Sequence, residues 1–353
     1  MSDYSALDRT LHALALNFHT VKAASFDLEC SLSRLQGADI ANRRHVFVTG
    51  LARSGTSLLL RILHQTGIYV SQSYRDMPFV LAPRLWRKIS AGWHRSGQSK
   101  ERVHGDGLYV DFDSVEAFEE VFWQTFAGDL YVRDQRLLAH RVSADLASRF
   151  RDFVAAVLAS QGTEERKRYL SKNNNNVLRL PGLARSLPKA CIVVPFRTPV
   201  PHAQSLLRQH RNLGEAQISD PFVRKYMAWL GHYEFGRDFR PFVFGDAAPA
   251  AGEDTQQLDY WVRNWTRVYR GILSTLPESA ILWDFDAFCT DPQAMATALA
   301  EYLDLDAGTL RSATNQIRAV ASYEATEGIP KVDLDAAWDT HGELRRRALT
   351  SAV

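Results

Sequence analysis

The sequence predicts an α/β protein of three layers, in which helices cover both faces of a central parallel sheet. Apolar runs of strand length alternate with longer helical patterns, which is typical of right-handed βαβ units. The clearest runs lie at residues 45–49, 190–196 and 280–285. Hydrophobic residues make up 46% of the 353 residues, so we expect a folded globular chain. We expect a single domain over residues 1–353, made of an N-terminal helical extension at 1–40, a core at 41–310 and a C-terminal tail at 311–353.

The N-terminal segment is predicted to be an amphipathic helix, because Leu7, Leu11, Leu14 and Phe18 recur at helical spacing. Acidic residues interrupt its apolar residues, so we do not expect a signal peptide. No apolar run approaches 18 residues, so we expect no membrane span and a cytoplasmic protein. The three cysteines are too far apart for a metal site or a disulfide framework.

The most informative motif is the loop that follows the first strand, Gly50-Leu-Ala-Arg-Ser-Gly-Thr-Ser57. A strand, a glycine-containing loop and a helix in this order form an anion site, because backbone N–H groups and the positive helix N-terminus face the ligand. The two glycines have the spacing of a Walker A motif, but Thr56 stands where that motif needs lysine. The cation lies inside the loop instead, at Arg53. The loop therefore predicts a phosphate-type site that fits an ATPase poorly.

The middle of the chain contains a long irregular stretch at residues 68–112, rich in aromatic, arginine and histidine residues. A loop of this length inside a compact domain is usually functional, so we expect it to line a pocket or to act as a lid. Helices are predicted at residues 114–126, 143–160 and 177–187, with a loop at the four asparagines 173–176.

A second basic site follows the second strand. Arg197 lies at the end of that strand, and Ser205 follows eight positions later in a helix that begins near Pro199. Ligands of open α/β sheets bind at the carboxyl ends of the strands, so this site and the glycine loop are expected at one edge. A helix with a core face that includes Trp261 and Trp265 precedes the third strand, and another helix is predicted from Pro292 to Leu303.

These landmarks resemble the sulfotransferase superfamily that uses 3′-phosphoadenosine 5′-phosphosulfate (PAPS), over roughly residues 45–303. The loop Arg53 to Ser57 resembles its 5′-phosphosulfate loop, in the form found in tyrosylprotein and many bacterial members. Arg197 and Ser205 match its 3′-phosphate motif, and Lys172 matches a lysine that precedes a short helix. A late strand followed by Asp-Pro at 291–292 also matches. The resemblance implies the P-loop NTPase-like sulfotransferase fold and transfer of a sulfuryl group to a hydroxyl or amine.

The resemblance also implies roles for particular residues. Arg53 would neutralise the leaving 5′-phosphate, and Arg197 and Ser205 would hold the 3′-phosphate. The backbone and hydroxyl groups of Ser54, Gly55, Thr56 and Ser57 would cradle the 5′-phosphate. Lys172 would orient the sulfuryl oxygens. No metal is expected, since sulfuryl transfer depends on positioning and on charge stabilisation.

The base that accepts the acceptor's proton is expected to be Asp76, which follows the loop helix as the base glutamate does in tyrosylprotein-type members. The alternatives are His104 and Asp106. Asp76 could instead cap a helix or pair with an arginine.

The acceptor stays open among small molecules, lipids, carbohydrates and peptides, and the oligomeric state is not predicted. Nucleic acid is not expected as a partner, because the net charge is only +2. Two other functions also stay open. A P-loop kinase would need acidic Mg²⁺ ligands such as Asp284 and Asp286, and a non-catalytic nucleotide-binding protein would keep the loop without the chemistry.

Overall fold

The computed structural model describes residues 6–32, 40–91, 100–101, 109–110, 118–161, 167–245, 252–314 and 326–350. Its centre is a sheet of five parallel strands in the order β10-β8-β1-β7-β2. The strands are β1 (Val46–Val48), β2 (Tyr69–Val70), β7 (Arg168–Lys172), β8 (Cys191–Phe196) and β10 (Ala280–Asp284). From β1 the chain crosses to the edge strand β2, returns to β7 beside β1, and then passes to β8 and β10 on the other side of β1. The point at which the order reverses therefore lies beside β1, where open α/β sheets bind ligands.

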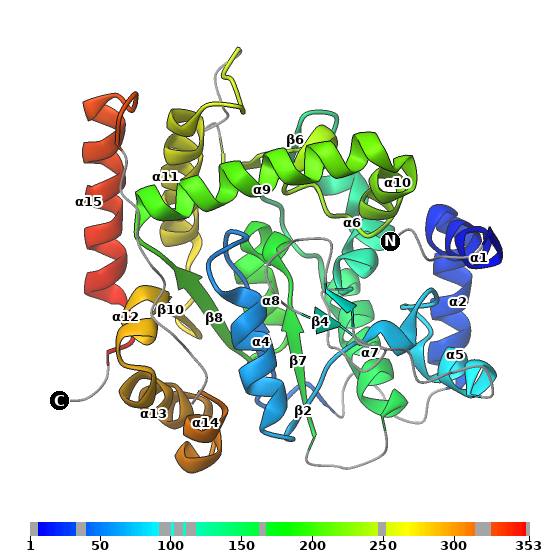
Figure 1. The fold of residues 1–353 in the computed structure, drawn as a ribbon. Helices are drawn as coiled ribbons and strands as arrows, with labels where there is room; N and C mark the ends of the chain where they lie inside the picture. The colour runs from blue at the N-terminus through cyan, green and yellow to red at the C-terminus, as the bar shows by residue number, and fades with distance from the viewer. Residues whose placement is uncertain are drawn as a thin grey trace.

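One face of the sheet is covered by the helix that follows the glycine loop, which lies in front of the strands in Figure 1, and by three later helices that share its apolar core. They are α4 (Thr56–Gln65), α12 (Phe285–Thr290), α13 (Pro292–Leu303) and α14 (Ala307–Ala313). Val46 and Val48 of β1 face this side and pack with Leu59 and Leu63 of α4. Phe47 lies between them in sequence and joins the core on the opposite face, as the two-residue period of a strand requires.

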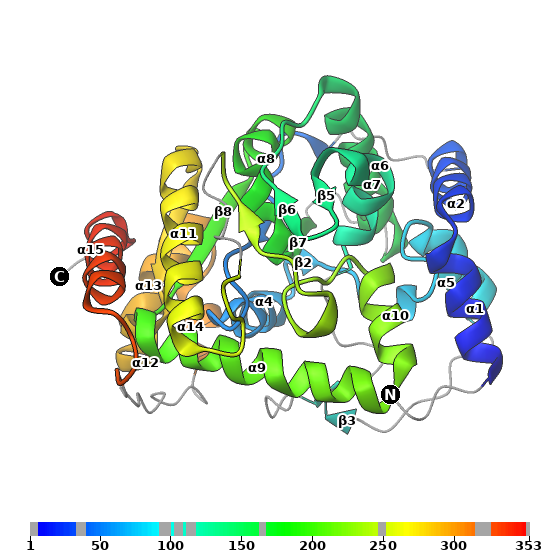
Figure 2. The ribbon, with the colours of Figure 1, turned by 90° about the horizontal axis from the view of Figure 1, so that it is seen from above.

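The larger core lies on the other face of the sheet. Figure 2, viewed from above, separates α4 and α14 on one side of the strands from α6 and α8 on the other. The helices that contribute buried residues to this core include α6 (Glu120–Tyr131), α7 (Ala144–Ser160), α8 (Leu180–Ser186), α9 (Pro199–Ser219), α11 (Leu258–Thr275) and α15 (Lys331–Arg347). Helix α9 runs across the edge at which β7 and β8 end (Figure 1). The predicted three-layer fold with a parallel central sheet is confirmed.

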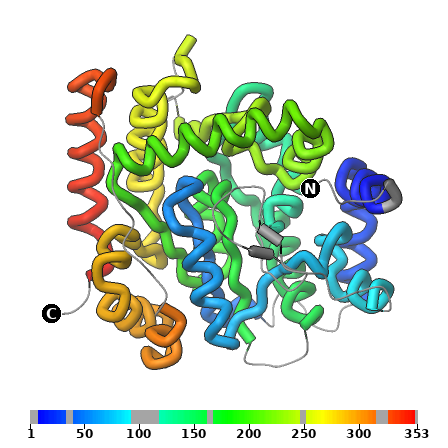
Figure 3. The backbone as a smooth tube through the Cα atoms, viewed as in Figure 1, coloured from blue at the N-terminus to red at the C-terminus, as the bar shows by residue number. Residues whose placement is uncertain are grey.

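Smaller elements surround this framework. They are α1 (Ala6–Asn17), α2 (His19–Leu32), α5 (Pro83–Ser90), α10 (Pro221–Trp229), the 3₁₀ helices η1 (Tyr74–Asp76), η2 (Asn174–Arg179) and η3 (Gly236–Asp238), the hairpin of β3 (Lys100–Glu101) and β4 (Tyr109–Val110), and the sheet of β5 (Val132–Arg133), β6 (Arg136–Leu138) and β9 (Phe242–Val243). The tube in Figure 3 shows that α1 and α15 lie at opposite ends of the molecule. Within the residues described, no helix is long and apolar enough to cross a membrane.

Two segments differ from the sequence-based expectation. The N-terminal extension forms two helices, α1 and α2, rather than one. The stretch 311–353, expected to be a tail, contains α15, and its Ala337 and Leu344 are fully buried. Arg263 of α11 pairs with Asp333 of α15 at 2.9 Å, so polar contacts also hold this helix. The predicted domain boundaries stay a prediction.

Buried histidines make the stability of this fold depend on pH. Burial lowers the pKa of His45 and of His210 to about 4, and that of His140 to about 3. The unfolded chain therefore binds protons below its ordinary histidine pKa of about 6.5 while the folded chain does not. The contribution of these histidines to the free energy of unfolding is fully present above that pH and is lost as the pH falls toward 4. We expect each histidine to cost about 1.4 kcal/mol at pH 5.5 relative to pH 7.5, measured by urea denaturation. An equal free energy of unfolding at both values would contradict this origin.

Candidate active site

The glycine loop joins β1 to α4 and lies at the switch point of the sheet. Three of its residues have positive φ, and two of these, Arg53 at 69° and Gly55 at 94°, lie well inside the left-handed region. The Ser54 hydroxyl donates to the Leu51 carbonyl at 2.7 Å, which closes the turn. Gly55 precedes α4 and has no side chain with which to cap it, so the helix N-terminus faces the bend of the loop. A loop of this shape suits the binding of an anion such as a phosphate.

Gly55 also permits a close contact with α12, which lies on the same face of the sheet as α4. A Cβ at this position would lie 2.2 Å from Cδ2 of Phe285, at the start of α12. Phe285 follows β10, so the loop after β1 and the segment after β10 pack against each other. The glycine is therefore required both by its backbone conformation and by the space available.

Arg197 and Ser205 lie beside this loop. Arg197 follows β8, the neighbour of β1, and its Nη1 donates to the Arg53 carbonyl at 3.3 Å. Ser205 lies on α9, and its hydroxyl accepts from Nε of Arg53 at 3.3 Å. The structure therefore brings together two cations and a hydroxyl that are separated by about 150 residues in sequence. Such a cluster suits two anionic groups on one ligand.

An acidic residue holds Arg197 in place. Asp286 of α12 lies 3.4 Å from Nε of Arg197 and accepts from the backbone N–H of Thr198 at 2.6 Å. The Arg197 guanidinium also lies 5.5 Å from the centre of the Phe285 ring. Asp286, one of the acids that a kinase could use for Mg²⁺, is thus committed to the arginine that follows β8.

His202 anchors the glycine loop to the helix layer, and sequence reasoning missed it. Its Nε2 lies 2.8 Å from the Ala52 carbonyl, and its Nδ1 lies 3.1 Å from Nε1 of Trp265. Because indole N–H can only donate, Nδ1 accepts and Nε2 carries the proton. Burial, and then the nearby Arg197, lowers the pKa of His202 to about 3, which keeps the ring neutral. Trp265, expected to be a core residue, is fully buried and also orients this histidine.

The asparagine run after β7 contacts the other side of the loop. Lys172 ends β7 in register with Val48 of β1. Asn174 accepts from the Thr49 hydroxyl with its carbonyl at 3.3 Å, and its side-chain Oδ1 lies 3.5 Å from Oγ1 of Thr56. Its Nδ2 donates to Glu234 at 3.1 Å. The predicted loop is instead the start of the buried 3₁₀ helix η2, with Asn173 as its N-cap.

A buried acidic pair holds this run in position. Glu119 accepts from Asn176 at 2.7 Å and from the Tyr169 hydroxyl at 3.0 Å. Glu120 accepts from Asn173 at 2.8 Å and pairs with Arg179 at 3.0 Å. Both glutamates are almost fully buried. Neither was expected in the site, because two adjacent acidic residues within a helix pattern are usually exposed.

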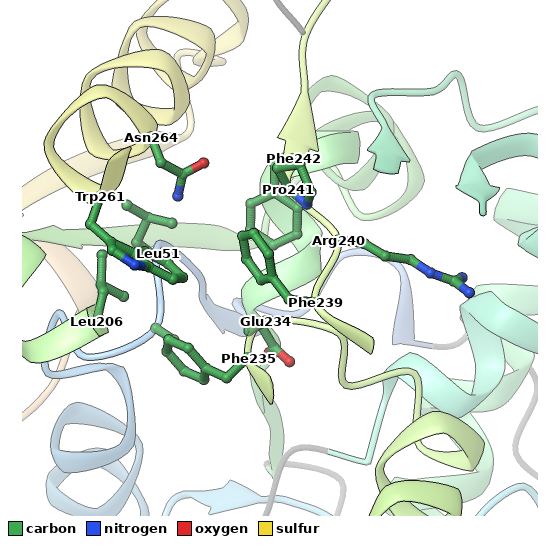
Figure 4. Close-up of a pocket in the computed structure, with 11 residues that line it drawn as sticks. Leu51, Leu206, Glu234, Phe235, Phe239, Arg240, Pro241, Phe242, Trp261 and Asn264 are labelled. Carbon is green, nitrogen blue, oxygen red and sulfur yellow. The ribbon is translucent and has the colours of Figure 1, made fainter. Parts of the chain in front are cut away.

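A small pocket opens beside the loop on the side of α9 and α11 (Figure 4). Most of its lining is apolar or aromatic, and its polar groups come from Glu234, Arg240 and Asn264. The apolar lining residues are Leu51, Ala52, Leu206, Phe235, Phe239, Pro241, Phe242 and Trp261. Burial alone raises the pKa of Glu234, but His232, 3.5 Å away, and Lys172 bring it down to about 2. Glu234 is therefore a negative charge at neutral pH.

A protein-family model matches the part of the chain that contains this arrangement. The model of the Sulfotransferase family matches residues 45–242, more than half of the chain. The chain belongs to the sulfotransferase family. The match covers the glycine loop, the asparagine run and the Arg197–Ser205 segment, which together form the candidate site.

Solved sulfotransferases share the fold at low sequence identity. Sulfotransferase STF1 from Mycobacterium tuberculosis H37Rv is 16% identical, with a TM-score of 0.51 over 97% of this chain and 87% of that chain. Sulfotransferase STF9 from Mycobacterium avium is 14% identical, with a TM-score of 0.48 over 96% and 95% of the two chains. The first likeness supports the fold alone. No curated protein matches the chain.

For this sulfotransferase the structure gives Asp76 a structural setting. Asp76 is fully buried, and Arg87 of α5 binds both of its oxygens, at 2.6 and 3.1 Å. It also accepts from the backbone N–H of Ser73 at 2.8 Å and so completes a capping box around η1. Its assignment as the base stays a prediction, although this environment favours the helix-cap and ion-pair alternative. The other candidates, His104 and Asp106, lie outside the described residues, as does part of the 68–112 stretch.

Asp284, the other acid that a kinase could use for Mg²⁺, is also bound by neighbouring groups. Asp284 caps α12 by accepting from the backbone N–H groups of Asp286 and Ala287, and it lies 3.3 Å from Arg345. Among the residues that the structure describes, no group of three or more metal-ligating side chains is found.

Gly55→Ala tests the tight fit of the loop. The positive φ and the contact with Phe285 should together cost roughly 1–3 kcal/mol of stability and distort the loop. Thermal unfolding and calorimetric titration with adenosine 3′,5′-bisphosphate measure the two effects. Gly214→Ala in α9 is the matched control, because no atom lies within 4 Å of its Cβ. Wild-type stability and affinity in Gly55→Ala would contradict the fit.

Asp76→Ala tests the structural role of that carboxylate. Removing the partner of Arg87 inside the fold should cost about 3 kcal/mol, measured by urea denaturation. Asp335→Ala breaks an exposed ion pair with Lys331 and should cost less than about 1 kcal/mol. If Asp76→Ala keeps full stability, the ion pair contributes little and the catalytic assignment gains support.

Proposed function

We propose that this sulfotransferase moves a sulfuryl group from PAPS to a hydroxyl or amine acceptor. The observation that carries the proposal is the convergence of Arg53, Arg197 and Ser205 at the carboxyl ends of β1 and β8. PAPS has two separate phosphate-type ends, and the loop and the Arg197–Ser205 segment form two adjacent anion sites. We also propose that the protein works in the cytoplasm, in keeping with its three unpaired cysteines.

In this proposal, different residues bind the 5′-phosphate and the 3′-phosphate of the donor. Arg53 and the loop N–H groups from Ser54 to Ser57 bind the 5′-phosphate, which gains charge as the sulfuryl group leaves. Arg197 and Ser205 hold the 3′-phosphate, and Asp286 keeps the Arg197 guanidinium oriented. Lys172, at the end of β7, orients the sulfuryl oxygens. Catalysis then rests on positioning the donor and stabilising the leaving group.

Calorimetry with adenosine 3′,5′-bisphosphate and with ATP plus Mg²⁺ separates this function from its two rivals. A sulfotransferase binds the bisphosphate more tightly and without metal, whereas a P-loop kinase prefers ATP with Mg²⁺. A non-catalytic nucleotide-binding protein binds the bisphosphate but transfers no sulfuryl group to any acceptor. Preference for ATP with Mg²⁺ would overturn the proposal.

Substitution of the two arginines should have different effects on binding and on turnover. Arg197→Ala removes a charge-assisted contact to the 3′-phosphate, worth about 1.5–3 kcal/mol, and should raise the Kd of the bisphosphate by roughly 10- to 100-fold. Arg53→Ala should mainly lower kcat, because its charge matters most when the phosphate leaves. Calorimetry and steady-state kinetics measure these effects. Arg346→Ala, on the exposed end of α15, is the control. An unchanged Kd in Arg197→Ala removes that residue from the site.

A further inference from the structure

We propose that the pair His202 and Trp265 positions the donor site, because the hydrogen bond from His202 to the Ala52 carbonyl keeps the turn at residues 51–54 in the form that binds the 5′-phosphate. Both residues act through the backbone of the glycine loop and neither touches the donor. The inference rests on the proposed function, since it explains how this loop binds one end of PAPS.

The bend of the glycine loop is a four-residue turn at 51–54. The backbone N–H and the hydroxyl of Ser54 both donate to the Leu51 carbonyl, at 3.3 and 2.7 Å. Within the turn, Arg53 has a φ of 69°, whereas the φ of Ala52 is not positive. A positive φ at the third position alone is the mark of a type II turn. That position is usually glycine, so an arginine there costs conformational free energy.

Neighbouring groups hold Arg53 in this unfavourable conformation. Among the described residues, the other non-glycine residue with a positive φ is Asp304, which ends α13, where the left-handed conformation is common. Arg53 is not at the end of a helix, so its conformation has to be maintained by contacts. Three of them come from one segment, in which Arg197 donates to its carbonyl, Ser205 accepts from its side chain, and His202 binds the carbonyl that precedes it.

The bond from His202 selects the type of turn. Types I and II differ by a rotation of the central peptide through about half a turn, and here that peptide joins Ala52 to Arg53. In a type I turn the φ of Arg53 would be about −90°, and the Ala52 carbonyl would point away from His202. Type I suits most residues, arginine included, so we expect the loop to adopt it when the bond from His202 is absent.

The direction of the Ala52 carbonyl also fixes an N–H group of the loop. A peptide bond is planar and trans, so the C=O of Ala52 and the N–H of Arg53 point in opposite directions. Helix α9 passes over the loop end of α4 (Figure 1), and the carbonyl is directed at His202 of that helix. The N–H is therefore directed away from α9 and joins the N–H groups proposed to bind the 5′-phosphate. In a type I turn the carbonyl oxygen would face the phosphate instead.

Trp265 keeps His202 in the form that can donate. Its indole N–H donates to Nδ1 of the histidine at 3.1 Å, so Nε2 carries the proton and donates to Ala52 at 2.8 Å. Both rings are fully buried. Trp265 lies on α11 and His202 on α9, so the turn is held by two helices of the layer beside it.

The first test compares two substitutions of His202. Methionine fills a similar length without a donor, whereas glutamine can place a donor where Nε2 lies. We expect His202→Met to raise the Kd of adenosine 3′,5′-bisphosphate roughly tenfold in calorimetry, and His202→Gln by less than about threefold. His210→Met is the control, because this buried histidine of α9 accepts from the backbone N–H of Gly236 instead of binding the loop. An unchanged Kd in His202→Met overturns the proposal.

The second test separates positioning from general stability. Arg53→Ala and Arg53→Gly both lack the guanidinium, but only glycine adopts a positive φ without cost. His202→Met should raise the Kd of the bisphosphate roughly tenfold when combined with Arg53→Ala, and less than about threefold when combined with Arg53→Gly. Equal factors in the two backgrounds would mean that His202 only supports packing, and the proposal would be wrong.

Trp265→Phe provides a test that leaves His202 in place, should its variants fail to fold in thermal unfolding. The substitution keeps an aromatic ring but removes the donor to Nδ1, so the proton of His202 can occupy either nitrogen. We expect the Kd of the bisphosphate to rise by about threefold. The control is Trp86→Phe, since the buried indole N–H of Trp86 has no partner among the described residues. Wild-type affinity in Trp265→Phe contradicts the role of the pair.

The outcomes separate this inference from the proposed function. If the wild-type protein does not bind the bisphosphate, the proposed function fails. If the wild-type protein binds the bisphosphate and transfers sulfuryl groups, while His202→Met binds the bisphosphate equally well, the inference fails alone.

Discussion

The site depends on the contact between the loops that follow β1 and β8. Arg197 donates to the backbone carbonyl of Arg53, and Ser205 accepts from the side chain of the same arginine. Both contacts exist only because β1 and β8 are neighbours in parallel register, with Val48 opposite Val193. The parallel sheet thus converts two distant sequence motifs into one cluster of positive charge. Helix α9 adds to this constraint, because His202 binds the Ala52 carbonyl one turn before Ser205.

The opposite side of the loop is held by polar groups rather than by apolar packing. Glu119 and Glu120 accept hydrogen bonds from the side chains of the asparagine run. The carbonyl of Asn174 accepts a hydrogen bond from Thr49, which directly precedes the glycine loop. Burying two carboxylates is costly unless hydrogen bonds satisfy them, and here amides, tyrosines and Arg179 supply those bonds. A satisfied polar network fixes one geometry, because any slip of the run leaves buried charges unpaired. We infer that this network maintains the spacing between β7 and the loop.

The sequence was sufficient where its signals were local and strong. The β8 and β10 strands are mostly continuous apolar runs. The loop around Gly55 has the glycine spacing that is typical of a phosphate-binding loop. It was insufficient where stability comes from distant partners. The β7 strand carries charged residues at both ends, Arg168 and Lys172, and α15 is mostly polar, so neither shows the apolar pattern of a core element. His202, Glu119 and Glu234 matter through hydrogen bonds to segments far away in sequence, which no local pattern reveals.

The site separates charge across the glycine loop. Arg53 and Arg197 lie on the β8 side, whereas the carboxylate of Glu234 lies beyond Asn174 on the β7 side. Sulfuryl transfer moves negative charge onto the leaving phosphate and releases a proton from the acceptor, so the two ends of the reaction need opposite electrostatic environments. A single anion site at the loop would satisfy only the first requirement. The Asn174 amide is neutral, so it connects the loop segment to the carboxylate without cancelling either charge.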